Sequence, residues 1–285
     1  MNASNKISII IVTYNSLPAL RICLSHLKPA VRRIDCELII VDNNSSDHSP
    51  SVAKNLWPDT KVIMNRINAG FAAACNIGAK EAHGTFLMFI NPDVFVDIHA
   101  VESLLEFMDK KEKIGAVGGR MRFPDGTFQP TCRNLPTLQN MIFSRGSFLW
   151  RILRSSHAYT WPDFAAPTEV PAVAGTLLMI RKDVFEKVGR FDSGYFMFME
   201  DTDICKRLSM LGFTNLFLPT AGAVHEWGKG SSVGSLKRNW HHHRSVQKYF
   251  MKHRRGWSTY IVLPIMLFVN FVVTSFFATL KFSKI

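Results

Sequence analysis

The chain has 285 residues, of which 47% are hydrophobic, and a formal net charge of +12. This length accommodates one large domain, or a domain with an appendage, and the apolar share suffices for a packed core. The net charge alone is typical of nucleic-acid-binding proteins, but its distribution argues against that class. Ten lysines and arginines and no acidic residue follow Glu226, whereas the preceding part is nearly neutral, with 24 basic and 22 acidic residues.

Strand and helix patterns alternate through the first half of the chain. Short apolar runs rich in β-branched residues predict strands at 7–13, 36–41, 61–64, 85–90 and 114–121. Helical spacing of apolar residues predicts helices at 70–82 and 97–110. An earlier helix is expected after Asn15 or Ser16, with Pro18 in its first turn. This alternation predicts an α/β fold with a mostly parallel sheet.

Polar residues follow four of these strands. They are Thr13-Tyr14-Asn15, Asp42-Asn43-Asn44, Asn68-Ala69-Gly70 and Asn91-Pro92-Asp93. Each group alone is compatible with ordinary turn chemistry. In parallel sheets, however, ligands bind beyond the carboxyl ends of the strands, so four such groups predict a nucleotide-type site. The dinucleotide and P-loop glycine signatures are absent, which disfavours those two classes of enzyme.

The region from 122 to 170 is less regular. Asp125-Gly126 predicts a hairpin between 121–123 and 127–128. The following stretch, 130–171, combines several prolines with large and basic residues, namely Trp150, Trp161, Arg145, Arg151 and Arg154. It fits either a variable substrate-facing segment or a surface connector.

Two adjacent carboxylates, Glu200 and Asp201, end the aromatic run 195–199. The apolar residues that follow at helical spacing are Ile204, Leu208 and Leu211. An acid at this junction would be partly desolvated and could accept a proton from a substrate hydroxyl. The alternative is that both acids only cap the helix and interact with its dipole.

The last uncharged stretch, 256–280, is long enough to cross a bilayer core as a helix. Basic residues precede it, and Trp257 and Tyr260 lie where an interfacial aromatic belt is expected. Pro264 and Asn270 interrupt the pattern, so an in-plane or re-entrant segment is an alternative, as is a buried core helix. The N-terminal region shows no secretion signal, and the catalytic part is therefore expected in the cytoplasm.

Two further groups of possible metal ligands are interpreted as structural. The five cysteines are scattered without CxxC spacing and predict small buried thiols, at Cys23, Cys36, Cys75, Cys132 and Cys205. The triplet 241–243 is all histidine, but neighbouring side chains on a helix point in different directions. We expect it to be a solvated basic stretch near the membrane.

Several segments together resemble the family 2 glycosyltransferases, which have the GT-A fold. They read ISIIIVTYNS, ELIIVDNNSSD, NAGFAAACNIG, FLMFINPDV, AGTLLMIRKDVFEKVGRFDSGYFMFMEDTDICKRL and VHEWGKGS. The resemblance covers roughly residues 6–235, and the block 174–232 is most similar to bacterial rhamnosyltransferases of cell-surface polysaccharide synthesis. It implies a glycosyltransferase domain at 1–235. The basic and hydrophobic remainder, 236–285, is expected to be a membrane-association segment.

The resemblance also implies roles for individual residues. The donor site would contain Thr13, Tyr14, Asn15, Asp42, Asn44, Asn68, Gly70, Asn76, Asn91 and Asp93. Asn91 stands where other members have the first acid of Asp-x-Asp, so Mg²⁺ or Mn²⁺ is expected to rest on Asp93 and His225. Asp201 would be the general base, and Glu200 would bind the donor or acceptor.

The implied reaction is a single, inverting displacement by a hydroxyl of a lipid-linked saccharide on a nucleotide-diphosphate sugar, with dTDP-L-rhamnose as the expected donor. Its context would be O-antigen or capsule synthesis at the cytoplasmic face of the plasma membrane. One base and one hard cation suffice for this chemistry. The alternative from another class is a membrane-tethered subunit that binds a nucleotide sugar or glycolipid without turnover. Nucleotidyltransferase activity is disfavoured, because no Gly-rich basic loop follows the first strand.

Overall fold

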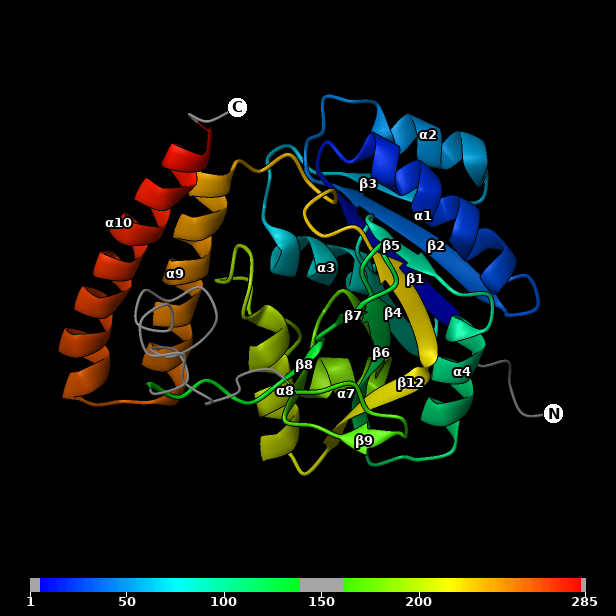
Figure 1. Cartoon of the computed structure of the whole chain (residues 1–285). Coiled ribbons are helices and arrows are strands. Elements are labelled where there is room, and N and C mark those ends of the chain that lie inside the picture. Colours follow the sequence, from blue (N-terminus) through cyan, green and yellow to red (C-terminus); the bar gives the residue numbers. More distant parts are fainter. Residues whose placement is uncertain (1–5, 139–160, 283–285) are drawn as a thin grey trace.

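The computed structural model describes residues 6–138 and 161–282. Strands and helices alternate through the N-terminal half (Figure 1). In chain order they are β1 (Ile7–Thr13), α1 (Leu17–Ala30), β2 (Cys36–Asp42), α2 (Ser49–Leu56), β3 (Lys61–Met64), α3 (Phe71–Lys80), β4 (Phe86–Ile90), β5 (Val94–Val96), α4 (Ala100–Asp109) and β6 (Ile114–Arg122). The C-terminal half continues with β7 (Phe128–Gln129), β8 (Cys132–Arg133), β9 (Thr168–Glu169), β10 (Ala172–Val173), β11 (Leu177–Arg181), α7 (Lys182–Lys187), α8 (Glu200–Met210), β12 (Thr214–His225), α9 (Ser235–His253), the π-helical turn η1 (Ser258–Val262) and α10 (Leu263–Phe282).

The main sheet is mostly parallel, as predicted. Its strand order is β3-β2-β1-β4-β11-β6-β12-β5, with β7 added to β6 and β9 to β12. Strands β3, β2, β1 and β4 run in the same direction, while β11 is antiparallel to both of its neighbours. The carboxyl ends of β1, β2 and β4 therefore meet at one edge, which is where the polar groups of the sequence lie.

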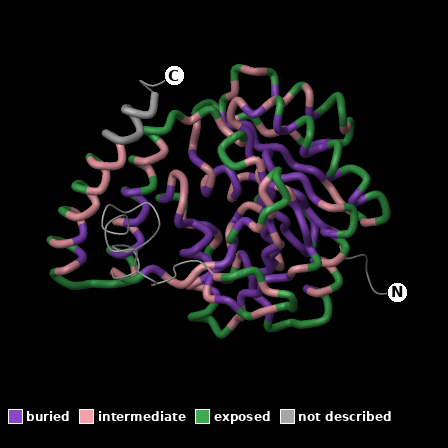
Figure 2. Tube along the Cα trace, viewed as in Figure 1, coloured by how far each residue is buried: buried purple, intermediate pink, exposed green. Residues whose placement is uncertain are grey.

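Helices cover both faces of the sheet, and the sheet divides the buried core into two clusters. Figure 2 shows the buried residues concentrated along the strands. On one face, alternate β1 residues such as Ile9 and Ile11 pack with α1, α2 and α4. On the other face, Ile10 and Val12 belong to a cluster that includes residues of α3, α7, α8 and α9. This alternation follows from the two-residue period of a strand with both faces buried. Helix α9 thus packs on the same core as the sheet.

Most of the predicted elements are confirmed, with informative exceptions. Helix α2 and strand β5 were not predicted, because each is too short for a clear period. Ser16 is the N-cap residue of α1 but makes no side-chain cap, and Asp47 Oδ2 instead accepts the Leu17 N–H at 2.8 Å. Leu211 lies past the end of α8 and is 48% exposed, so it does not belong to the buried face.

The predicted hairpin at Asp125-Gly126 is confirmed by the antiparallel pairing of β6 and β7. All five cysteines are free thiols, and all but the half-buried Cys36 are buried, as predicted. Trp161 is half-buried and packs against the core, and its indole N–H donates to Asn134 Oδ1 at 2.8 Å. The other large and basic residues of the predicted substrate-facing segment lie outside the described residues. They are Arg145, Trp150, Arg151 and Arg154.

Helices α9 and α10 form a C-terminal hairpin beside the sheet domain (Figure 1). The polar residues of α10 face α9: Asn270 Nδ2 lies 2.9 Å from His243 Nε2, and Asn239 of α9 donates to Thr274 and Ser275, each at 3.0 Å. The prediction that the histidine triplet is solvated was therefore wrong for His243, which is 7% exposed.

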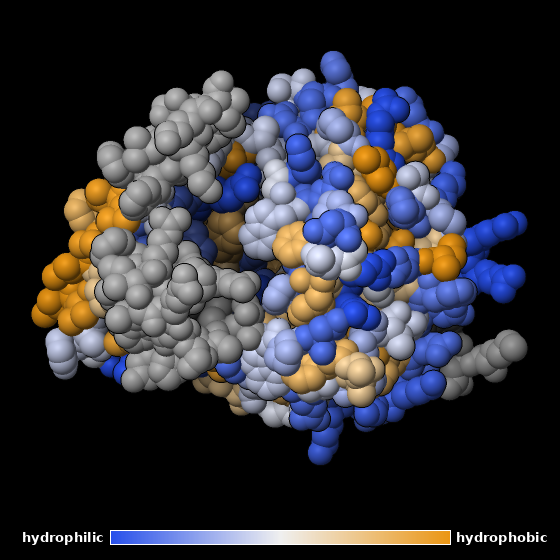
Figure 3. Space-filling model, viewed as in Figure 1, coloured by the Kyte–Doolittle hydropathy of each residue, from blue (hydrophilic) through white to orange (hydrophobic). Residues whose placement is uncertain are grey.

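The opposite face of α10 is apolar and exposed. It includes Ile265, Phe268, Val269 and Val272, and apolar side chains gather at the left edge of Figure 3, where α10 lies. Among the described residues, one helical stretch, Ser258–Ser275, is long and apolar enough to cross a membrane, and 11% of it is buried. Such low burial argues against a core helix.

Candidate active site

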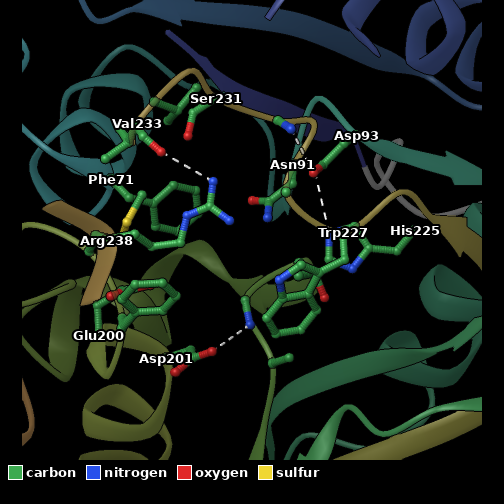
Figure 4. A pocket seen from close by; sticks show the side chains of 18 of the residues that line it. Phe71, Asn91, Asp93, Glu200, Asp201, His225, Trp227, Ser231, Val233 and Arg238 are labelled. Carbon is green, nitrogen blue, oxygen red and sulfur yellow. Dashed lines mark hydrogen bonds and ion pairs between the residues drawn. The ribbon is translucent and has the colours of Figure 1, made fainter. Parts of the chain in front are cut away.

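A cavity of about 390 Å³ opens at the carboxyl edge of the sheet. The four polar groups predicted from the sequence each contribute to its lining, through Tyr14, Asn43, Asn68 with Gly70, and Asn91 with Asp93. The pair Glu200 and Asp201 enters from the start of α8, and His225 from the end of β12 (Figure 4). The fold therefore unites residues that are more than 200 positions apart.

Asp93 and His225 form a buried pair on one side of the cavity. His225 Nε2 lies 3.4 Å from Asp93 Oδ1, and the two residues are 5% and 3% exposed, respectively. His225 Nδ1 lies 2.9 Å from Gln129 Oε1, and Nε2 is the ring nitrogen that faces Asp93.

The Asp93 carboxylate is only partly satisfied. Its Oδ2 accepts the Gly230 N–H at 2.7 Å, while Oδ1 is buried without a hydrogen-bond partner. A Cβ on Gly230 would lie 2.6 Å from Oδ1, so this loop position needs a glycine. A buried carboxylate oxygen without a hydrogen-bond partner, next to an imidazole nitrogen, is a ligand pair suited to a divalent cation.

The turn before α8 holds the second pair of functional groups. Phe198 and Met199 both adopt left-handed backbone conformations, with φ of 68° and 67°. Such conformations are uncommon for large residues and persist only where the surroundings impose them. Glu200 and Asp201 follow at once, in the first turn of α8, where the helix dipole favours their negative charge.

Asp201 is held by several hydrogen bonds. Its Oδ2 accepts from Arg133 Nη2 at 2.7 Å and from the Gly175 N–H at 2.9 Å. Its Oδ1 accepts from the Thr202 N–H at 2.6 Å and from the Thr202 hydroxyl at 3.1 Å. These contacts fix the carboxylate against the cavity wall.

Glu200 has a different environment. It is 6% exposed and its Oε2 has no hydrogen-bond partner. Burial, together with the neighbouring charge of Asp201, raises the pKa of Glu200 to about 8. At neutral pH Glu200 therefore favours its protonated form.

Gly70 allows α3 to begin close to this turn. It has φ +85°, and a Cβ there would lie 2.5 Å from the Phe196 carbonyl oxygen. The next amide, that of Phe71, donates to the same oxygen at 2.7 Å. Any larger residue at position 70 would push the 196–199 turn away from the cavity.

Five of the predicted donor-site residues do not line the cavity. Thr13 donates to Asp42 Oδ1 at 2.8 Å, and both are fully buried. Asn15 Oδ1 accepts from the Ser46 N–H at 2.7 Å, and Asn44 has a left-handed φ of 66° in the same loop. Asn76 bonds both the N–H and the carbonyl of Phe191, at 3.1 and 2.8 Å. These contacts shape the backbone around the site, and direct roles of these five residues in donor binding stay predictions.

Sequence reasoning missed several lining residues, notably Arg133, Phe71, Gln129, Trp227 and Arg238. Trp227 is 63% exposed and lies in the VHEWGKGS segment, so its position beside His225 could have drawn attention to it. Arg238 lies in the segment assigned to membrane association, and its charge was attributed to that role.

The sequence model of "Glycosyl transferase family 2" matches residues 8–189, more than half of the chain. The chain belongs to this family. One relative of this family 2 glycosyltransferase is the N-acetylglucosaminyl-diphospho-decaprenol L-rhamnosyltransferase of Mycobacterium tuberculosis, 28% identical over 87% of this chain and 85% of the relative. Rhamnosyltransferase WbbL of Escherichia coli K12 is 27% identical over 51% of this chain and 54% of its own.

Solved structures share the same GT-A fold. The mannosyltransferase PcManGT from Pyrobaculum calidifontis, in complex with GDP-Man and Mn²⁺, superposes with a TM-score of 0.62 at 17% identity, over 96% of this chain and 74% of that one. GalNAc-T7, with UDP, GalNAc and Mn²⁺, superposes with a TM-score of 0.60 at 20% identity, over 87% and 48%. The predicted fold class and enzyme class of this family 2 glycosyltransferase are confirmed.

Proposed function

We propose that this enzyme transfers L-rhamnose from a nucleotide-diphosphate donor, dTDP-L-rhamnose, to a hydroxyl of a lipid-linked saccharide, with inversion at the anomeric carbon. The observation that carries the proposal is one cavity that contains both the Asp93–His225 pair and the Glu200–Asp201 pair. The names of the relatives support rhamnose as the sugar and a polyprenyl-diphosphate saccharide as the acceptor. The pathway would then be O-antigen or capsule synthesis.

Asp93 Oδ1 and His225 Nε2 are the atoms that would hold Mg²⁺ or Mn²⁺. A cation bound there would neutralise the charge that develops on the departing diphosphate. Among the described residues no cluster of three or more acidic, histidine or cysteine side chains forms a complete metal site. Two protein ligands fit a cation that shares its remaining positions with phosphate oxygens and water.

The acceptor proton would go to Asp201. A carboxylate oriented by four hydrogen-bond donors keeps a fixed direction, which general-base catalysis requires. Arg133 must then yield one Oδ2 position, or share it, when the acceptor hydroxyl approaches. Glu200, protonated at neutral pH by virtue of its raised pKa, can donate a hydrogen bond to donor or acceptor.

The acceptor also accounts for the C-terminal hairpin. We propose that the apolar face of α10 binds the cytoplasmic leaflet of the plasma membrane, where a polyprenyl-linked saccharide is confined. Confinement of enzyme and acceptor to one surface raises their effective concentration. The division at residue 235 between the catalytic domain and the membrane-association segment is part of the same proposal.

A transfer assay tests this function. Purified full-length enzyme would be incubated with dTDP-rhamnose, UDP-sugars and GDP-sugars, each with a polyprenyl-diphosphate saccharide. We expect rhamnosylated lipid, abolished by EDTA and restored by Mg²⁺ or Mn²⁺. Full transfer in EDTA would contradict the metal assignment. Donor binding without product in any combination would favour the non-catalytic binding subunit instead.

A further inference from the structure

Arg238 is a second cationic feature of the cavity, contributed by the C-terminal hairpin. It lies in the first turn of α9, and its side chain is half-buried. Figure 4 shows it reaching into the cavity, with its guanidinium directed toward Asn91. Of the described residues that line the cavity, two are arginines, and the other, Arg133, is paired with Asp201.

The Arg238 guanidinium has unused donor capacity. Within the described part of the chain, no carboxylate lies within ion-pair distance of it, and its Nη2 donates to the Val233 carbonyl at 3.2 Å. A guanidinium carries five N–H donors in a planar fork that matches phosphate oxygens. A half-buried arginine without an acidic partner in a ligand cavity is therefore suited to bind an anion.

One short loop connects Arg238 with the predicted metal ligands. Gly230 donates to Asp93 Oδ2 at 2.7 Å, and a Cβ on Gly228, at φ +86°, would lie 3.0 Å from Arg238 Nη1. The loop between β12 and α9 thus touches the Asp93 carboxylate at one glycine and the guanidinium at another. Arg238 thus lines the same cavity as Asp93 and His225, where a cation on that pair would bind a diphosphate.

We infer that Arg238 binds the diphosphate of the nucleotide-sugar donor, and that the C-terminal hairpin thereby completes the donor site. This inference rests on the proposed function. Two diphosphates can reach this cavity, that of the donor and that of the polyprenyl acceptor. The shared loop with Asp93 assigns Arg238 to the donor.

Equilibrium binding of nucleotides to the full chain tests this assignment. The probes are dTDP, UDP and GDP and the corresponding monophosphates, each with Mg²⁺. In Arg238→Gln the affinity for the diphosphate should fall roughly 10- to 100-fold, since a charge-assisted hydrogen bond is lost. The monophosphate should lose less, and Arg238→Lys should recover part of the diphosphate affinity because it keeps the charge but not the fork.

The matched control is Lys237→Gln, which removes the same charge from the adjacent, exposed position of the helix. It should bind every nucleotide as the unaltered enzyme does, and all variants should keep the melting midpoint of the unliganded protein. Unchanged diphosphate affinity in Arg238→Gln overturns the inference, and an accompanying rise in acceptor KM would move Arg238 to the acceptor diphosphate. An unaltered enzyme that binds no nucleoside diphosphate overturns the proposed function itself.

Discussion

At the scale of residues, Glu200 and Asp201 are chemically distinct although they are neighbours. Asp201 accepts four hydrogen bonds, whereas Glu200 is buried with one oxygen unpartnered. The sequence alone could place both acids at the start of a helix, but their different environments depend on Arg133 and Gly175, which are remote in the chain. The difference in environment between the two acids is thus a property of the fold.

Asp201→Asn should reduce turnover on the order of 10²–10⁴-fold, because it removes the proposed base while nearly preserving its shape. Donor affinity should change little. Single-turnover transfer and nucleotide titration measure the two quantities separately. Glu200→Gln is the matched comparison, since it neutralises the adjacent acid. If Glu200→Gln is inactive while Asp201→Asn still turns over, the base is Glu200 and not Asp201.

Glu200 should also make the stability of the enzyme depend on pH. Its pKa is about 8 in the folded protein against an ordinary value of 4.5, so the folded state binds the proton more tightly than the unfolded state. The stability that this protonation provides is complete below about pH 4.5 and is lost as pH rises through about 8.

The Glu200→Gln variant cannot lose that proton. The difference in melting midpoint, variant minus unaltered enzyme, should therefore increase from pH 5.5 to pH 8.5. The control is Glu106→Gln, on the exposed side of α4, whose ion-pair partner is Lys110; it should give a constant difference. A constant difference for Glu200→Gln as well would show that this carboxyl ionises normally.

At the scale of elements, the sequence predicted what depends on local pattern. The strands with apolar runs, β1 to β4 and β6, and the helices α1, α3, α4 and α8 were found close to their expected positions. The antiparallel insertion of β11 between β4 and β6 was not predictable, because strand direction is set by the course of the chain and not by its side chains. The position of Arg133 at the site was likewise not predictable, because it depends on where the chain places β8.

The contacts of helix α9 with the catalytic domain were not predicted from the sequence. Its basic residues suggested membrane binding, but Lys248 and Lys252 form ion pairs with Asp192 at 2.8 Å. His241 stacks on Phe196 with ring centroids 4.2 Å apart. Three of the expected membrane-facing or solvated side chains are therefore engaged with the catalytic domain, and composition could not distinguish these uses of positive charge.

The apolar face of α10 should determine membrane attachment. Ile265 and Phe268 are 60% and 67% exposed, and their joint replacement by serine should weaken binding to anionic vesicles roughly 100-fold or more, because each buried apolar side chain contributes about 1.5–3 kcal/mol. Sedimentation with vesicles measures this. Met210→Ser, 72% exposed on the catalytic domain, is the control and should leave binding unchanged. Equal vesicle binding by the double variant would exclude this face as the contact.

At the scale of the whole molecule, the catalytic domain and the hairpin share one core. Leu263, at the start of α10, is 2% exposed and belongs to the cluster that contains α3 and α8. Asn270 contacts His243 of α9. Deletion of everything after Arg255 would remove both contacts, so loss of activity in such a truncation could come from the fold as well as from the membrane. Surface substitutions on α10 separate these two causes.

Helix α9 contacts the cavity region on one face and α10 on the other. Arg238, His241 and Ser245 contact the cavity and the turn before α8, while Asn239 and His243 contact α10. In evolutionary terms, the hairpin is a poor candidate for exchange between enzymes of this family. If a chimera took its sequence from another family member after residue 235, the residue at position 238 of the cavity would come from that other enzyme. If the exchange began near residue 256, α9 would have to pack against an α10 from another enzyme. We therefore expect the residues proposed for membrane attachment and those proposed for donor binding to evolve together.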